Sequence, residues 1–360
     1  MRRLPPDIST LYAELLEQLT IVDARRTIGY GAGSFVTKTI KGNEYLFFQH
    51  AAPGGVLKQQ YIGRVTPALE TLVRQFNAGR ADVADDHASI ERLCALLRLG
   101  GAAVTDTGSA RVITALADAA VFRLGGMLVG TQAFIIMNNM LGVRWADGML
   151  RTDDVDVAGE HTLAIAVPEL RADIPTALEA LAMGFLPVPG LSPKSPSTSF
   201  KVRGKSLRVD LLTPATGAAR KSGEPVFLAR FGAAAEPLRF LDYLLEAPQP
   251  AALIDGAGVL VSVPQPARFA MHKLLVARSR PSAFQAKAEK DLRQAAYLIE
   301  VLRQDRPGDL RLAVEAIDAR GQAWRKAFDE GIALLARRDP DAAEHVRALR
   351  IHRRSRVRRT

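Results

Sequence analysis

The sequence predicts an α/β core with an N-terminal α+β extension and a C-terminal helical unit. Strand-like and helix-like apolar patterns alternate between residues 110 and 212, which is typical of an α/β arrangement. A β-rich stretch over 35–63 precedes this region, and helical periodicity dominates from Pro266 onward. We expect four units: an N-terminal helix and β-hairpin accessory region at 1–82, the core at 83–265, a helical domain at 266–346, and a basic tail at 347–360.

Composition indicates a soluble protein with a large core. The 360 residues are 48% hydrophobic, and Cys94 is the single cysteine, which fits a reducing cytoplasm and excludes a cysteine-based zinc site. The N-terminus has no apolar segment typical of a signal peptide, and no apolar run reaches the length of a membrane span. We therefore expect a cytoplasmic protein with no membrane partner.

The net charge of +10 is concentrated at the C-terminus. Residues 347–360 contain seven arginines and no acid, so the rest of the chain has a net charge of only +3. A basic tail of this kind either holds phosphate backbones electrostatically or is a solvated, frayed terminus. Nucleic acid binding through the tail is therefore one possible partner interaction.

Helical spacing of apolar residues predicts most of the remaining elements. In the N-terminal half we expect helices over 8–26, 66–78, 86–99, 110–122, 132–141 and 174–183. In the C-terminal half we expect a hairpin over 251–263 and helices over 266–278, 284–303, 308–337 and 341–352.

Basic and aromatic residues are interleaved in the β-rich stretch near the N-terminus. They are Lys38, Lys41, Lys58, Arg64, Tyr45, Phe47, Phe48 and Tyr61. Such a pattern fits a nucleic-acid surface, and it also fits a sheet with one solvated face.

Two acidic positions fall on predicted strands. In the segment Asp154-Val155-Asp156-Val157, alternation places both aspartates on one side and both valines on the other. Two adjacent carboxylates repel each other, and a divalent cation such as Mg²⁺ removes that repulsion. Asp210 stands in a second predicted strand, 206–212, where an acid between apolar residues is costly without a partner.

Gly130 and Thr131 lie between a predicted strand and the helix 132–141. A helix that begins directly after a strand offers backbone N–H groups and a positive dipole end, which together can bind phosphate. Glycine lets a phosphate approach the backbone closely.

Taken in order, these segments resemble the nucleotidyltransferase superfamily that includes DNA polymerase beta, kanamycin nucleotidyltransferase and the minimal nucleotidyltransferases. In this resemblance Gly130-Thr131 matches the Gly-Ser position, Asp154 and Asp156 match the D-x-D motif, and Asp210 matches the third carboxylate. Residues 121–215 look still closer to a poorly characterised family of stand-alone bacterial proteins with this fold. The resemblance implies a mixed-sheet nucleotidyltransferase core, and it extends through residue 303.

The resemblance also implies a reaction. Two Mg²⁺ ions, with Mn²⁺ as a substitute, would be held by Asp154, Asp156 and Asp210, and a nucleoside monophosphate would pass from a nucleoside triphosphate to an acceptor hydroxyl. The acceptor is a small molecule, a tRNA or a protein. Gly130 and Thr131 would hold the triphosphate, and Lys273, Lys287 and Lys290 would offset its charge or form a solvated helix face. The loop 187–199 would close over the acceptor or serve as a connector.

Two other functions remain open at this point. The fold can bind a nucleotide or a partner protein without turnover, because the sequence shows no recognisable acceptor pocket. Alternatively, the protein binds RNA through its arginine-rich tail.

Overall fold

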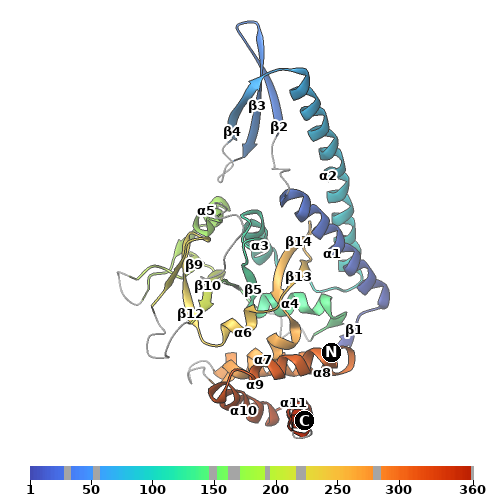
Figure 1. Cartoon of the computed structure of the whole chain (residues 1–360), viewed down its shortest axis with the longest axis vertical. Coiled ribbons are helices and arrows are strands. Elements are labelled where there is room, and N and C mark those ends of the chain that lie inside the picture. Colours follow the sequence, from blue (N-terminus) through green and yellow to red (C-terminus); the bar gives the residue numbers. More distant parts are fainter. Residues whose placement is uncertain are drawn as a thin grey trace.

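The computed structural model describes residues 1–27, 34–51, 57–145, 152–160, 171–190, 195–215, 224–278 and 285–357. Over these residues the architecture is mixed α/β with helices toward the C-terminus, so the expected fold class is confirmed (Figure 1). None of the helices in the described part of the chain combines the length and the apolar character that crossing a bilayer requires.

A mixed sheet of seven strands lies at the centre of the described structure (Figure 1). The main path follows the order β11-β12-β10-β7-β5, while β9 pairs with β10 and with β8. Strands β7, β10 and β12 are parallel, and the other pairings are antiparallel. The bounds are β5 Met127–Val129, β7 Asp154–Ala158, β8 Phe185–Pro187, β9 Ser199–Val202, β10 Arg208–Pro214, β11 Val226–Leu228 and β12 Ala233–Leu238.

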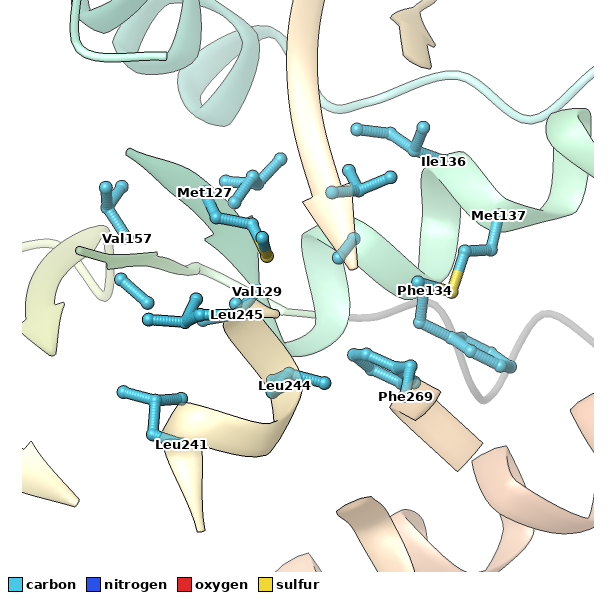
Figure 2. Close-up of a cluster of buried hydrophobic side chains, with 14 of the residues drawn as sticks. Met127, Val129, Phe134, Ile136, Met137, Val157, Leu241, Leu244, Leu245 and Phe269 are labelled. Carbon is cyan, nitrogen blue, oxygen red and sulfur yellow. The ribbon is translucent and has the colours of Figure 1, made fainter. Parts of the chain in front are cut away.

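Helices and a hairpin pack around this sheet. Figure 2 shows side chains from β5, α4, α6 and α7 meeting in one cluster, with Met127, Phe134, Leu244 and Phe269 among them. The elements concerned are α3 Thr107–Asp118, α4 Gly130–Met140, α5 Ile174–Ala180, α6 Leu241–Leu245, β13 Pro248–Leu253 and β14 Val259–Pro264. These apolar contacts pack the helices against the sheet.

The C-terminal helices begin directly after β14. They are α7 Pro266–Ala277, α8 Gln285–Asp305, α9 Pro307–Asp318, α10 Gln322–Ala336 and α11 Pro340–Val357. The expectation of one helix over 308–337 was wrong, because Gly321 adopts a φ of +99° and separates α9 from α10. That backbone conformation is readily available to glycine and breaks a helix.

The C-terminal basic segment is helical through Val357. The Arg350 guanidinium is only 15% exposed and pairs with Asp318 at 2.9 Å and with Asp329. At Arg350 the expectation of a frayed terminus was therefore wrong, because two acids from neighbouring helices hold the side chain. The side chains of 351–360 lie outside the described residues.

The N-terminal part forms a projecting arm. Helix α1 Pro6–Thr27 packs beside the second half of α2 Pro67–Leu99, and a three-stranded sheet lies at the far end of α2 (Figure 1). Its strands are β2 Ser34–Ile40, β3 Asn43–Ala51 and β4 Leu57–Arg64. The expectation of two helices over 66–78 and 86–99 was wrong, and the expected boundary after residue 82 falls inside α2. The intervening stretch breaks the apolar pattern, but nothing in it prevents a helix from continuing.

Two further strands join the N-terminus to the core. Strand β1 Arg2–Arg3 pairs with β6 Val143–Arg144, directly after α4.

Candidate active site

Asp154 and Asp156 point to the same face of β7. Val155 and Val157 are fully buried on the opposite face, as the alternation along a strand requires. Both aspartates are only partly exposed. The strand therefore places two carboxylates side by side above a closed apolar layer.

Asp210 lies next to Asp156 on the neighbouring strand. Strands β7 and β10 are parallel, and their register pairs Asp210 with Asp156 and Arg208 with Asp154. Directly paired residues in a sheet project to the same face. The structure therefore brings all three carboxylates together on one face of the sheet.

Two side chains engage the Asp210 carboxylate. The Arg208 Nε atom lies 2.6 Å from Asp210 Oδ1, and the Ser199 hydroxyl donates a hydrogen bond to the same oxygen. Among the described residues, no group of three or more acidic, histidine or cysteine side chains is already arranged to bind a metal ion.

Burial and repulsion act strongly on Asp156. Its pKa is raised to about 7, first because the carboxylate is withdrawn from water and then because Asp210 and Asp154 are close. Lys273 and Lys287 oppose this rise. The protein alone therefore does not fully offset the negative charge of ionised Asp156. A bound cation would offset it.

The backbone of Gly130 lies directly beside the Asp156 carboxylate. It has a φ of +65° at the start of α4, and a Cβ atom at this position would lie 2.0 Å from Asp156 Oδ2. Any other residue would both strain the backbone and displace the carboxylate. The N-cap residue, Val129, makes no side-chain hydrogen bond to the first turn of α4. Because Gly130 begins α4, the positive end of the helix dipole lies beside the Asp156 carboxylate.

Three lysines from α7 and α8 surround the acidic face. Lys287 Nζ lies 4.0 Å from Asp154. Lys273 is buried and forms an ion pair of 2.6 Å with Asp291. The pKa of Lys290 is lowered, mainly by burial and then by the neighbouring charge of Lys273. For Lys273 the alternative of a solvated helix face is excluded, because its side chain is only 10% exposed.

Residues 107–318 match the profile of a known protein family. That family is described as nucleotidyltransferase, and the match spans more than half of the chain. The chain belongs to this nucleotidyltransferase family. It is therefore a transferase of nucleotidyl groups, as the resemblance implied.

Two other comparisons add little to this assignment. No curated protein matches the nucleotidyltransferase chain. Among solved structures, it is similar to an antigenic nucleotidyltransferase-like protein from Paracoccidioides brasiliensis, with 15% identity and a TM-score of 0.36. That similarity covers 68% of this chain and 94% of the other.

Sequence reasoning missed a fourth carboxylate of the nucleotidyltransferase. Glu236 on β12 pairs with Leu212, two residues beyond Asp210, so it faces the same side of the sheet. Its pKa is raised by burial and then by the charge of Asp210. The available signal was a single acid within the apolar segment Ala233–Leu238, but only the pairing of β12 with β10 places it near the site.

The loop expected over 187–199 is only partly described. Residues 191–194, which include Ser192 and Lys194, lie outside the described residues. The two ends of the loop belong to β8 and β9, and Ser199 at the second end contacts Asp210. The sequence therefore identified a segment that adjoins the site, although the specific contact was not anticipated.

Proposed function

We propose that the protein transfers a nucleoside monophosphate from a nucleoside triphosphate to an acceptor hydroxyl, with Mg²⁺ as cofactor and pyrophosphate as the leaving group. Family membership supplies the reaction class. The observation that carries the proposal is the register that pairs Asp210 with Asp156 beside Asp154.

The donor set fits Mg²⁺. Three carboxylates offer the hard oxygen ligands that this ion prefers. The pKa of Asp156 is raised first by burial and then by the negative charges of Asp210 and Asp154, which a bound cation would offset. Asp154, Asp156 and Asp210 would hold the metal, with Mn²⁺ as a substitute and two ions as the proposed number. When bound, the metal supplies charge neutralisation at the phosphates and lowers the pKa of the acceptor hydroxyl.

The triphosphate would lie between the start of α4 and the lysines of α7 and α8. Gly130 and Thr131 offer backbone N–H groups at the helix N-terminus, which bind phosphate oxygens. Lys287 and Lys290 border the same acidic face, and the buried Lys273 adds positive charge beneath it. These groups would orient the α-phosphate toward the carboxylates.

The transfer itself forms one bond and breaks one. The acceptor oxygen attacks the α-phosphorus while the bond from that phosphorus to the bridging oxygen of the β-phosphate breaks, and the electron pair leaves with pyrophosphate. Asp210 would accept the proton of the acceptor hydroxyl. Because Arg208 binds Asp210, the same arginine would hold that carboxylate in a fixed orientation.

The proposal is tested with each of the four nucleoside triphosphates labelled at the α-phosphate. The purified chain is incubated with Mg²⁺ and with a tRNA pool, protein or small-molecule extract, and pyrophosphate release and label transfer are measured. Asp156→Ala should abolish both signals. Asp153→Ala is the matched control, since Asp153 is an exposed acid that precedes β7, and it should retain them.

The outcomes separate the proposal from a silent binding module. Label on one of the three acceptor fractions, lost in Asp156→Ala alone, supports transfer and identifies the acceptor class. Thermal stabilisation by a nucleoside triphosphate without pyrophosphate release in any fraction would favour a nucleotide-binding module. Equal signals from Asp156→Ala and the wild type would contradict the proposed catalytic role of the carboxylates.

A further inference from the structure

The three-stranded sheet of the arm has two chemically different faces. On one face, Phe35 and Phe48 make edge-to-face contacts with Phe76 of α2, at 5.0 and 5.8 Å between ring centroids. Leu46 on the same face is 3% exposed. This face is the small hydrophobic core of the arm, and it fixes the sheet on α2.

The opposite face, here called the outer face, carries aromatic, basic and amide side chains. The register places them together even across the irregularity between Leu46 and Phe47, since Tyr45 pairs with Arg64, Phe47 with Tyr61, and Lys38 with Tyr45. The outer face is defined by Lys38, Tyr45, Phe47, Gln49, Gln59, Tyr61 and Arg64.

The aromatic rings of the outer face form one surface. The Tyr61 ring lies 5.5 Å from the Phe47 ring and 6.1 Å from the Tyr45 ring. Tyr61 is 56% exposed, so its ring is available to a ligand. Exposed aromatic side chains on a sheet are a general means of binding the bases of single strands by stacking.

The charge of the outer face complements a phosphate backbone. Lys38 lies over the Phe47 ring at 5.1 Å, and Arg64 stands at the end of β4. Between residues 34 and 64 the sequence has four basic residues and one acid, Glu44, which alternation directs to the opposite face. No acidic residue of the described strands shares the outer face, so an anionic partner meets no repulsion there.

We propose that the outer face binds single-stranded RNA. The bases stack on the aromatic surface, and Lys38 and Arg64 attract the phosphates. The Gln59 amide donates a hydrogen bond to the Gln49 amide oxygen and accepts one from Lys38. The remaining amide donors and acceptors of the two glutamines can pair with a 2′-hydroxyl, and this favours RNA over DNA. The proposal is independent of the proposed catalysis, because it concerns a sheet at the far end of α2 from the core (Figure 1).

The test measures binding of a fluorescein-labelled oligouridylate of roughly 20 nucleotides to the full chain by anisotropy. Tyr61→Ala should weaken binding at least about 5-fold, which corresponds to the loss of one stacked base, whereas Tyr61→Phe should retain it. Arg64→Glu should weaken binding and reduce its salt dependence. Circular dichroism establishes that each variant is folded.

Two control variants test whether the same charge change, or the loss of an exposed aromatic ring, weakens RNA binding when it is made outside the outer face. Arg74→Glu makes the same charge change on α2, which packs against the other face, and Phe227→Ala removes an aromatic ring that is 63% exposed on β11. Both should bind RNA as the wild type does.

The proposal would be overturned by no RNA binding at low salt, by equal affinity for the matching DNA, or by equal loss in the controls. A dimer that dissociates in Tyr61→Ala without any RNA binding would instead assign the outer face to a second copy of the chain, and it would overturn the proposal too.

Discussion

Asp156 is the residue at which stability and proposed function conflict. Its ionised form is disfavoured by burial and by Asp210 and Asp154, yet that ionised form is the one a cation needs. A pKa of about 7 in the folded protein lies above the ordinary value near 4, so ionisation weakens the folded state as pH rises between these two values. A residue that costs stability at neutral pH is typical of a functional position.

Asp156→Asn should therefore stabilise the metal-free protein at high pH. At about pH 3, below both the unfolded and the folded pKa, the two proteins should unfold at similar temperatures, because Asp156 of the wild type is then protonated in both states. At pH 8 the variant should be more stable, by up to about 4 kcal/mol. Thermal unfolding in a chelating buffer measures this difference.

The control for this experiment is Asp153→Asn, which removes an exposed acid next to the strand and should show no such pH dependence. Addition of Mg²⁺ should then stabilise the wild type more than Asp156→Asn. A wild type that gains stability relative to Asp156→Asn as pH rises would contradict the electrostatic account.

Gly130→Ala tests the close approach of the α4 backbone to Asp156. The new methyl group would meet Asp156 Oδ2, and the backbone at φ +65° would also be strained. We expect a loss of roughly 1–3 kcal/mol in stability and a loss of pyrophosphate release.

Gly184→Ala separates the two causes. Gly184 has a similar φ of +78°, but a Cβ atom added there would meet nothing within 4 Å, so this variant carries only the backbone cost. Pyrophosphate release should survive Gly184→Ala. Equal loss of activity in both variants would show that the contact between Gly130 and Asp156 has no special role.

At the scale of elements, the local sequence pattern predicted the features that are determined within a single strand or a single helix. The alternation of Val155 and Val157 with two aspartates was enough to predict β7 and the direction of its carboxylates. By contrast, Glu236 and Ser199 reach the site only through the pairing of β12 and β9 with β10. Such long-range pairing leaves no periodic signal in the sequence, and for that reason these residues were missed.

The buried pair of Lys273 and Asp291 links α7 to α8 in the same non-local way. The Lys273 ammonium also lies 4.9 Å from the Phe269 ring centroid. Removing one partner leaves an uncompensated buried charge, so Lys273→Met should destabilise the protein by about 3–5 kcal/mol. The double variant Lys273→Met/Asp291→Leu should recover most of that stability.

Denaturant unfolding measures the stability of the single and double variants. Binding of a nucleoside triphosphate is then measured on the double variant. Weak nucleotide binding in a stable double variant would assign Lys273 to the nucleotide site. Full nucleotide binding would restrict Lys273 to a structural role.

For the whole molecule, α1 links the arm to the body. Its apolar residues pack with the second half of α2 and with Ala252 and Ile254 in one cluster, which includes Leu15, Leu97 and Cys94. The Tyr12 hydroxyl accepts a hydrogen bond from the Ala252 amide and donates one to the Ala252 carbonyl, at 3.0 and 3.3 Å. The sequence placed α1 in a separate N-terminal unit because contacts across 240 residues cannot be read from periodicity.

Tyr12→Phe tests whether α1 unfolds together with the body. Loss of the hydroxyl leaves buried backbone groups of Ala252 without this partner, so we expect destabilisation of about 1–3 kcal/mol. Both tryptophans, Trp145 and Trp324, lie in the body, so their fluorescence reports on its unfolding. A lower denaturation midpoint by tryptophan fluorescence would place α1 in the same cooperative unit.

Tyr61→Phe, which removes a hydroxyl from an exposed ring, should leave the midpoint unchanged. An unchanged midpoint in Tyr12→Phe, with a separate early transition by circular dichroism, would instead favour an N-terminal unit that unfolds independently of the body.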